Sequence, residues 1–143
     1  MIEHIWSVLC SRSVIDRDSN NISLVEVIEQ LQVTGSSAGV LPISLELVTL
    51  WSRSHPERAA KGLARLAVIA PDGSKSEPAE YQVNLTSHQR LRGRARIQGL
   101  PIRGAGRYQF DVHIKVEGDE DWRKVASIPL DLSIEPLAES PTG

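Results

Sequence analysis

The clearest indication of the fold class is the segment Tyr108-Gln-Phe-Asp-Val-His-Ile-Lys-Val116. Large apolar side chains occupy every second position, and Gln, Asp, His and Lys fill the positions between them. Successive side chains of a strand point to opposite faces, so this alternation predicts a strand with one dry face and one wet face. A sheet that meets water on one side is typically antiparallel. The stretch therefore predicts an antiparallel sheet that covers a core.

Similar runs recur on both sides of this stretch, separated by turn residues such as Pro71-Asp-Gly73. About eight strands at this spacing predict an all-β protein, an antiparallel β-sandwich of about eight strands. Among them we expect Arg92 to Gln98 to form one strand and Gly99 to Gly106 to make an irregular crossing to the next. The positions that we expect in the core are Leu45, Leu47, Val68, Val83, Phe110, Val112, Ile114, Ile128 and Leu130.

One segment, 22–33, carries signals for both helix and strand. Ser23 and Glu26 have the spacing of a helix capping box, and apolar residues at 24, 28 and 31 have helical spacing. The β-branched valines at 25, 27 and 33 favour a strand instead. We interpret the segment as a strand, regular or bulged, with a helix as the alternative.

Length and composition indicate one domain. The chain has 143 residues, 41% of them hydrophobic and 24% charged, with a net charge of −2, so it can bury a core without a disulfide or a metal. We expect a single β-sandwich domain over 1–134 and a flexible C-terminal tail over 135–143, which contains two prolines and no periodicity. The start lacks the basic region of a signal peptide and no apolar run is long enough to span a membrane. We therefore expect a cytoplasmic protein without a membrane partner.

Three segments resemble a known family: Leu66-Ala-Val-Ile-Ala-Pro-Asp-Gly73, then Gly99-Leu-Pro101 leading to Gly106-Arg-Tyr-Gln-Phe-Asp-Val-His-Ile114, and Val125-Ala-Ser-Ile-Pro-Leu-Asp-Leu132. The family consists of small uncharacterised bacterial proteins whose single domain, a domain of unknown function, is a β-sandwich similar to immunoglobulin-like and C2-like folds. The resemblance implies an immunoglobulin-like or C2-like fold. It implies no activity and no catalytic residues, because the family has none established.

Positive charge is concentrated in the segment 81–110, which contains no Asp or Glu. Its candidate anion-binding residues are Arg90, Arg92, Arg94, Arg96, Arg103 and Arg107. In an extended chain the first four project from one face, and we call them the arginine stripe. Guanidinium groups bind oxyanions in a bidentate manner, so the stripe is a candidate site for phosphates or an acidic partner. The interpretation that we favour over this one is a solvated face neutralised by cross-strand acids such as Asp111 or Glu117. With six aromatic residues in the chain, nucleic-acid binding by base stacking is not expected.

Acidic turns suggest a calcium site that the spacing does not support. Asp16-x-Asp18-x-Asn20 opens like a calcium loop, but Asn21 and Val27 stand where the EF-hand needs Gly and Glu. Aspartates in apical loops of C2-like sandwiches can bind calcium, which leaves a group of weak candidates. These are Asp16, Asp18, Asp119, Glu120 and Asp121. We expect ordinary turn residues, and no metal or other cofactor.

No pattern of nucleophile, base and acid is present in the sequence. Cys10 and His4 are a candidate pair, but six residues of extended chain separate them, so a buried structural thiol is the better interpretation. The three tryptophans at 6, 51 and 122 suit either a sugar-stacking platform or core packing, and their parity favours the core. We expect a protein that is not an enzyme.

These observations predict a non-enzymatic cytoplasmic interaction module that binds another protein through its loops or an exposed sheet edge. Binding of a phosphorylated or anionic ligand along the arginine stripe is the alternative function. Open sheet edges also lead us to expect a homodimer.

Overall fold

The computed structural model describes residues 1–36 and 38–136, and in these residues the chain forms nine β-strands and no helix. The strands are β1 (Ile2–Ile15), β2 (Ile22–Val27), β3 (Gln30–Thr34), β4 (Ala38–Arg53), β5 (Ala60–Ile69), β6 (Ala79–Leu85), β7 (Arg90–Arg103), β8 (Gly106–Val116) and β9 (Arg123–Glu135). The all-β prediction is confirmed. The described residues contain nine strands where the sequence predicts about eight.

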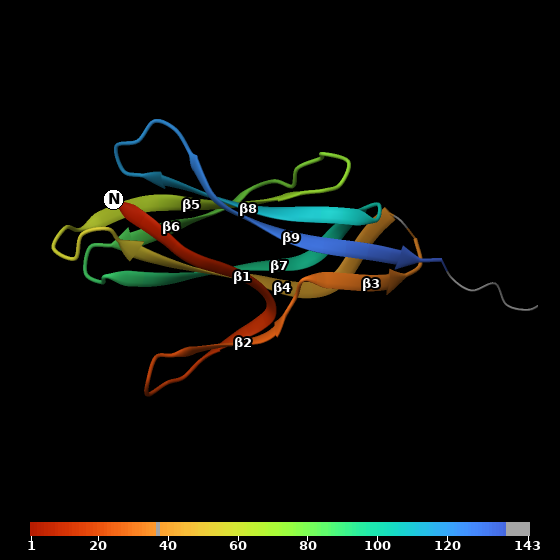
Figure 1. Ribbon diagram of the computed structural model, residues 1–143, viewed down its shortest axis with the longest axis horizontal. Helices are drawn as coiled ribbons and strands as arrows, with labels where there is room; N and C mark the ends of the chain where they lie inside the picture. The colour runs from red at the N-terminus through yellow and green to blue at the C-terminus, as the bar shows by residue number, and fades with distance from the viewer. Residues whose placement is uncertain (37, 137–143) are drawn as a thin grey trace, which may run out of the picture.

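The strands form two sheets that pack face to face as a β-sandwich (Figure 1). The first sheet has the order β2-β1-β4-β7, and the second has the order β3-β9-β8-β5-β6. Every pair is antiparallel except β3 with β9, which run parallel. The antiparallel β-sandwich predicted from the sequence is therefore confirmed, with one parallel pair that alternation could not reveal, because alternation reports which face a residue occupies and carries no information on strand direction.

The ambiguous segment 22–33 is two strands in two different sheets. Glu26 near its break has a φ of 53°, a left-handed conformation that neither a regular strand nor a helix contains. At the break, the Ile28 N–H donates to the Leu9 carbonyl at 2.8 Å, and the Asp131 N–H donates to the Glu29 carbonyl at 3.1 Å. The chain crosses here from the first sheet to the second, which explains why neither one helix nor one strand was correct.

Strand β7 is longer than predicted and bends at Gly99. Gly99 has a φ of 81°, and on the neighbouring strand the register shifts between Leu41 and Ser44. Apolar residues face the core at odd positions before the bend and at even positions after it. The strand therefore continues through the segment that we predicted as an irregular crossing, and the passage to β8 takes only Gly104 and Ala105. Tyr108 Oη holds this passage, since it accepts from the Arg103 N–H at 2.7 Å and donates to the Gly104 carbonyl at 2.8 Å.

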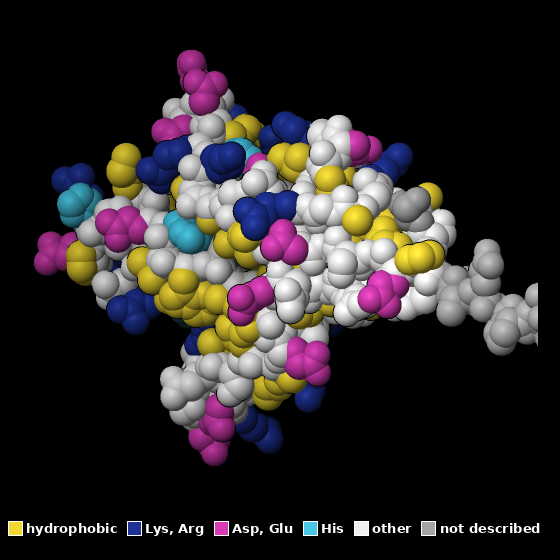
Figure 2. Space-filling model, turned by 45° about the vertical axis from the view of Figure 1, so that its right-hand side comes forward, with side chains coloured by type: hydrophobic (Ala, Val, Ile, Leu, Met, Phe, Trp, Pro, Cys, Tyr) yellow, Lys and Arg dark blue, Asp and Glu magenta, His cyan; other side chains and the backbone are white. Residues whose placement is uncertain are grey.

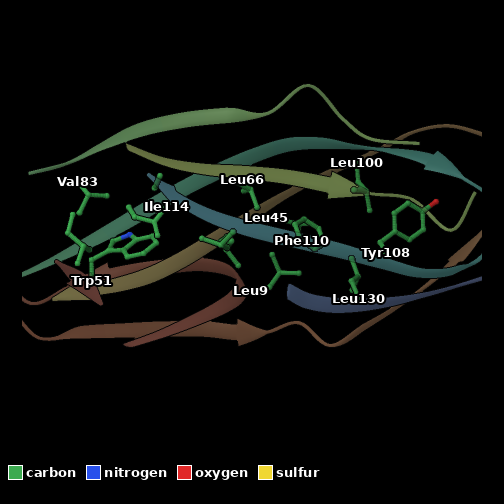
Figure 3. Close-up of a cluster of buried hydrophobic side chains, with 14 of the residues drawn as sticks. Leu9, Leu45, Trp51, Leu66, Val83, Leu100, Tyr108, Phe110, Ile114 and Leu130 are labelled. Carbon is green, nitrogen blue, oxygen red and sulfur yellow. The ribbon is translucent and has the colours of Figure 1, made fainter. Parts of the chain in front are cut away.

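One hydrophobic core lies between the sheets (Figure 3). Seven predicted core residues are buried: Leu45, Leu47, Val83, Phe110, Val112, Ile114 and Leu130. Val68 and Ile128 are only half-buried and pack against the core from its margin. Trp51 is fully buried, but Trp6 and Trp122 are partly exposed, so the prediction that all three tryptophans pack in the core was wrong for two of them.

Glu135 still belongs to the domain, because it pairs with Thr34 at the end of β9. Strand β9 thus ends one residue after position 134, and most of the predicted tail, 137–143, lies outside the described residues. Over the residues that the structure describes, no helix is long and apolar enough to cross a membrane.

Candidate functional site

The arginine stripe lies on β7, at one edge of the first sheet. Its four members stand opposite Ser52, Leu50, Val48 and Glu46 of β4, so they share one face of the sheet. That face is turned away from the core, because the intervening Leu91, Ala95 and Ile97 pack against the core cluster. The alternation seen in the sequence therefore places the stripe as predicted from strand periodicity.

The β1–β2 hairpin covers part of the same face. Figure 1 shows it as an arm that leaves the body on the side of the first sheet. Ser13 Oγ of this hairpin donates to the carboxylate of Glu46. Arg94 Nη1 donates to the same Ser13 hydroxyl at 3.3 Å, and Arg92 Nη2 donates to the carbonyl oxygen of Asn20. The arm thus binds the middle of the stripe through neutral oxygens.

Only one carboxylate lies near the stripe in the described part of the chain. Arg96 Nε is 3.8 Å from Glu46 Oε2, and the Arg96 side chain remains 68% exposed. The acids that we considered as neutralising partners lie elsewhere: Asp111 is on the second sheet, where Ser127 Oγ donates to it at 2.6 Å, and Glu117 follows β8 of that sheet. Neutralisation of the stripe by these two residues was therefore a wrong expectation. Three of its four arginines have no carboxylate within 4.0 Å among the described residues.

The other two candidate arginines do not join the stripe. Arg103 lies past the bend of β7, at the far end of the strand. Arg107 is on β8 and forms an ion pair with Asp131, with Nε 2.9 Å from Oδ1. This pair raises the pKa of Arg107 and lowers the pKa of Asp131. The six arginines are thus divided between two sheets.

The free edge of β7 is the feature that the sequence did not reveal. The strand pairs with β4 on one side, and no described backbone group pairs with its other side. At 14 residues it is the longest of the four edge strands, since β2, β3 and β6 have 6, 5 and 7. An edge of this length presents a row of unpaired backbone donors and acceptors. It is a surface on which another strand can pair.

An apolar cleft of about 290 Å³ lies beside this edge, between the two sheets. Its floor includes Ala95 and Ile97 of β7 together with Leu66 and Val68 of β5. The cleft exists because β6 pairs with β5 only as far as Leu66, so the sandwich is left open beyond that point. The charged residues that also line it are Lys75, Glu77, Arg96 and Arg103.

A second hollow, of about 630 Å³, separates the arm from the start of the stripe. Its polar lining comes from Asn20, Asn21, Arg90 and Arg92, and Trp6 contributes an aromatic ring. Arg92 Nη1 is buried here without a hydrogen-bond partner among the described residues. A buried cationic donor without a partner is costly, so an acceptor oxygen from a ligand would stabilise it.

Figure 2 shows a face on which acidic and basic side chains are mixed, with hydrophobic side chains where the arm joins the body. Three large hydrophobic residues of the β1–β2 hairpin are exposed: Val14, Ile15 and Val27. Because charges of both signs are interspersed on this face, it offers no single-sign surface comparable with the stripe.

The candidate calcium ligands do not lie together in one place. Asp16 and Asp18 lie at the tip of the arm, and Asp119, Glu120 and Asp121 lie in the β8–β9 loop on the opposite side of the molecule (Figure 1). Asp16 Oδ1 accepts the N–H groups of Ser19 at 2.8 Å and Asp18 at 2.9 Å, and these bonds lower the pKa of Asp16. Among the described residues no three acids, histidines or cysteines are grouped as metal ligands.

Cys10 and His4 are not paired either. The Cys10 Sγ donates to the Glu46 carbonyl at 3.5 Å, and burial raises the pKa of this thiol. His4 Nε2 is hydrogen-bonded instead to Ser7 Oγ at 2.7 Å. Neither residue lines any of the hollows described above. The tryptophans form no platform, and one face of Trp122 is covered by the Arg65 guanidinium, 4.0 Å from the ring centroid.

Two half-buried histidines predict a loss of stability in mild acid. Burial lowers the pKa of both His4 and His113. The folded state then binds fewer protons than the unfolded state, so stability is fully present above the unfolded pKa of about 6.5 and is lost as the pH falls from there through the lower folded pKa. We expect the melting temperature to fall between about pH 7.5 and about pH 5.5. The slope should flatten in His4→Gln and His113→Gln, and a full slope in the double variant would contradict this. His55→Gln and His88→Gln, on exposed loops, are the controls.

Comparisons with known proteins show a likeness in fold only. No family model matches the chain, and no curated protein matches it in sequence. The C-terminal domain of Wzt is 12% identical with a TM-score of 0.49, over 99% of this chain and 83% of that chain. An immunoglobulin-like protein from Pseudomonas aeruginosa is 13% identical with a TM-score of 0.40, over 92% and 96%. A family 123 glycoside hydrolase from Clostridium perfringens is 7% identical with a TM-score of 0.46, over 97% of this chain and 28% of that one.

Proposed function

We propose that this protein is a non-enzymatic interaction module that binds another protein along the open edge of β7. The observation that carries the proposal is a 14-residue edge strand, β7, which pairs with β4 on one side, has no backbone partner on the other among the described residues, and lies beside an apolar cleft. In strand addition, the backbone hydrogen bonds of such an edge supply affinity, and pockets for alternate side chains supply specificity. A free strand edge and an apolar cleft are both present on this side of the sandwich.

The arginines favour a different protein as the partner over a second copy at this edge. Two β7 edges paired with one another would bring arginines of both stripes onto one face, and like charges on neighbouring strands are destabilising. Charged side chains are a common device that keeps edge strands from pairing with themselves. The homodimer that the sequence leads us to expect would therefore need another surface.

A phosphorylated or anionic ligand is the second candidate. It is favoured by the hollow beside Arg90 and Arg92 and by the buried Nη1 of Arg92. Such a ligand would contact the arm and the start of the stripe, whereas a protein strand would contact the β7 edge and the cleft. Binding of an anionic ligand and binding of a protein strand should therefore affect different residues.

Site-specific photo-cross-linking in the cells that make the protein tests the proposal. A photoreactive amino acid replaces Gln98, which is exposed on β7, or Gln109, which is exposed on β8 between two paired neighbours. We expect a discrete adduct from position 98, mapped by mass spectrometry to an extended segment of one partner, and no such adduct from 109. Equal adducts from both positions, or none from 98, would remove the proposed function.

A further inference from the structure

We infer that the segment bound at the β7 edge is an extended strand in which acidic and apolar side chains alternate. The inference rests on the proposed binding at this edge and names the chemistry of the partner. It follows from what lies on either side of the edge: arginines on the outer face and an apolar cleft on the inner face.

A strand added to β7 continues the pleat of the sheet, so its side chains point alternately to the two faces. On the outer face they lie beside the stripe, where Arg90 and Arg94 are exposed and Arg96 is 68% exposed. On the inner face they lie over Ala95, Ile97 and Val68, which line the cleft. One parity of the partner therefore meets guanidinium groups, and the other meets hydrophobic side chains.

We expect carboxylates at the positions of the partner strand that face outward, beside the arginine stripe. Among the described residues, the carboxylate within 4.0 Å of the stripe is that of Glu46, which is itself only 4% exposed and already accepts from Ser13. Guanidinium groups on alternate residues of one strand repel one another, and opposite charges on a neighbouring strand relieve that repulsion. Glutamate or aspartate at every second position supplies the missing charge in the spacing of the stripe.

We expect apolar side chains at the positions of the partner strand that face inward, over the cleft. Ala95, Ile97 and Val68 are only partly buried although they pack against the core, so their exposed area would be covered by a partner side chain. The alternation can persist only from 90 to 98, because the faces of β7 exchange at Gly99. This bend limits the length of the matching segment to the first part of the strand.

Synthetic peptides of about nine residues with blocked ends test the inference. One alternates valine and glutamate, a second has the same composition with the glutamates in one block, a third alternates valine and lysine, and a fourth alternates valine and glutamine. Binding is followed by calorimetry and by NMR shifts of the full chain. We expect the alternating acidic peptide to bind about tenfold or more tightly than the other three, with shifts at 91–97 and Val68.

Charge reversal distinguishes binding at the arginine stripe from an attraction that depends only on the net charge of the protein. The variant Arg90→Glu with Arg94→Glu should prefer the lysine peptide, because both residues are exposed and neither has a carboxylate partner among the described residues. Arg58→Glu with Lys61→Glu changes the net charge equally at exposed positions in the β4–β5 loop and on β5 of the second sheet, and should keep the wild-type preference. Arg94→Glu alone, with an unchanged melting temperature, repeats the test should the double variant unfold.

Backbone modification tests strand addition itself. N-methylation of all valines blocks one edge of the peptide, and N-methylation of all glutamates blocks the other, so one of the two peptides should lose binding. If the glutamine peptide shifts β7 as strongly as the glutamate peptide, the proposed edge binding stands and the acidic pattern is wrong. If no peptide shifts the NMR signals of β7 and position 98 gives no adduct, the proposed edge binding and the acidic pattern are both wrong. Shifts confined to Arg90, Arg92 and the arm with inorganic polyphosphate would overturn the inference in favour of the anionic ligand.

Discussion

Replacing Phe110 with alanine lowers the free energy of unfolding by about 3–5 kcal/mol, the usual cost of truncating a buried aromatic residue. Phe110 is fully buried and stands between Val68 of β5 and Ile128 of β9 in the second sheet. Figure 3 shows its ring among the core side chains between the two sheets. Because the two neighbouring strands and the facing sheet hold this site, it cannot collapse around a smaller side chain.

Urea denaturation followed by circular dichroism measures this loss. Gln109→Ala is the matched control, since Gln109 precedes Phe110 on the same strand and is exposed. We expect the control to lie within about 0.5 kcal/mol of the wild type. A loss below about 1 kcal/mol for Phe110→Ala would contradict the packing described here.

The second large effect is expected at Gly93, where a methyl group should destabilise a strand. Alanine normally stabilises a strand interior relative to glycine by about 0.5–1 kcal/mol. Here an added Cβ would overlap with Cε2 and Oη of Tyr81. The Tyr81 ring is held in place, because its Oη accepts from Trp51 Nε1 at 3.0 Å. We expect Gly93→Ala to lower the free energy of unfolding by about 1–3 kcal/mol, the range for overpacking.

A double-mutant cycle with Tyr81→Ala identifies the cause. In that background the ring is absent, so Gly93→Ala should be neutral or stabilising. The coupling free energy between the two positions then reports the clash, because the residues are in contact. Equal destabilisation in both backgrounds would show that the backbone, and not the Tyr81 ring, requires glycine.

Sequence patterns predicted which face of its sheet a residue occupies better than they predicted which strands pair with one another. The parity of Phe110, Val112 and Ile114 depends only on neighbouring residues, and all three are buried as predicted. Trp122 had the parity of Ile128, but β9 begins only at Arg123, so the alternation does not extend back to it. The pattern fails there because it holds only while the chain remains extended.

The same limit explains what was missed at the candidate site. The four arginines of the stripe were visible because their spacing is local. Their surroundings were not: Glu46 is 50 residues from Arg96 in sequence, and Ser13 is 81 residues from Arg94. The expected partner Asp111 lies in the other sheet, which no periodicity reports.

Residue patterns alone predict an all-β chain, the inward and outward positions of most strands, and four arginines on one face of an extended segment. Three further features follow from tertiary contacts: this segment is an edge strand, a cleft lies beside it, and Gly93 leaves room for Tyr81. The difference lies in the distance along the chain over which each interaction acts. Alternation and turn chemistry act within a few residues, whereas strand order and the gap left by the short β6 arise from hydrogen bonds and packing between residues far apart in the chain.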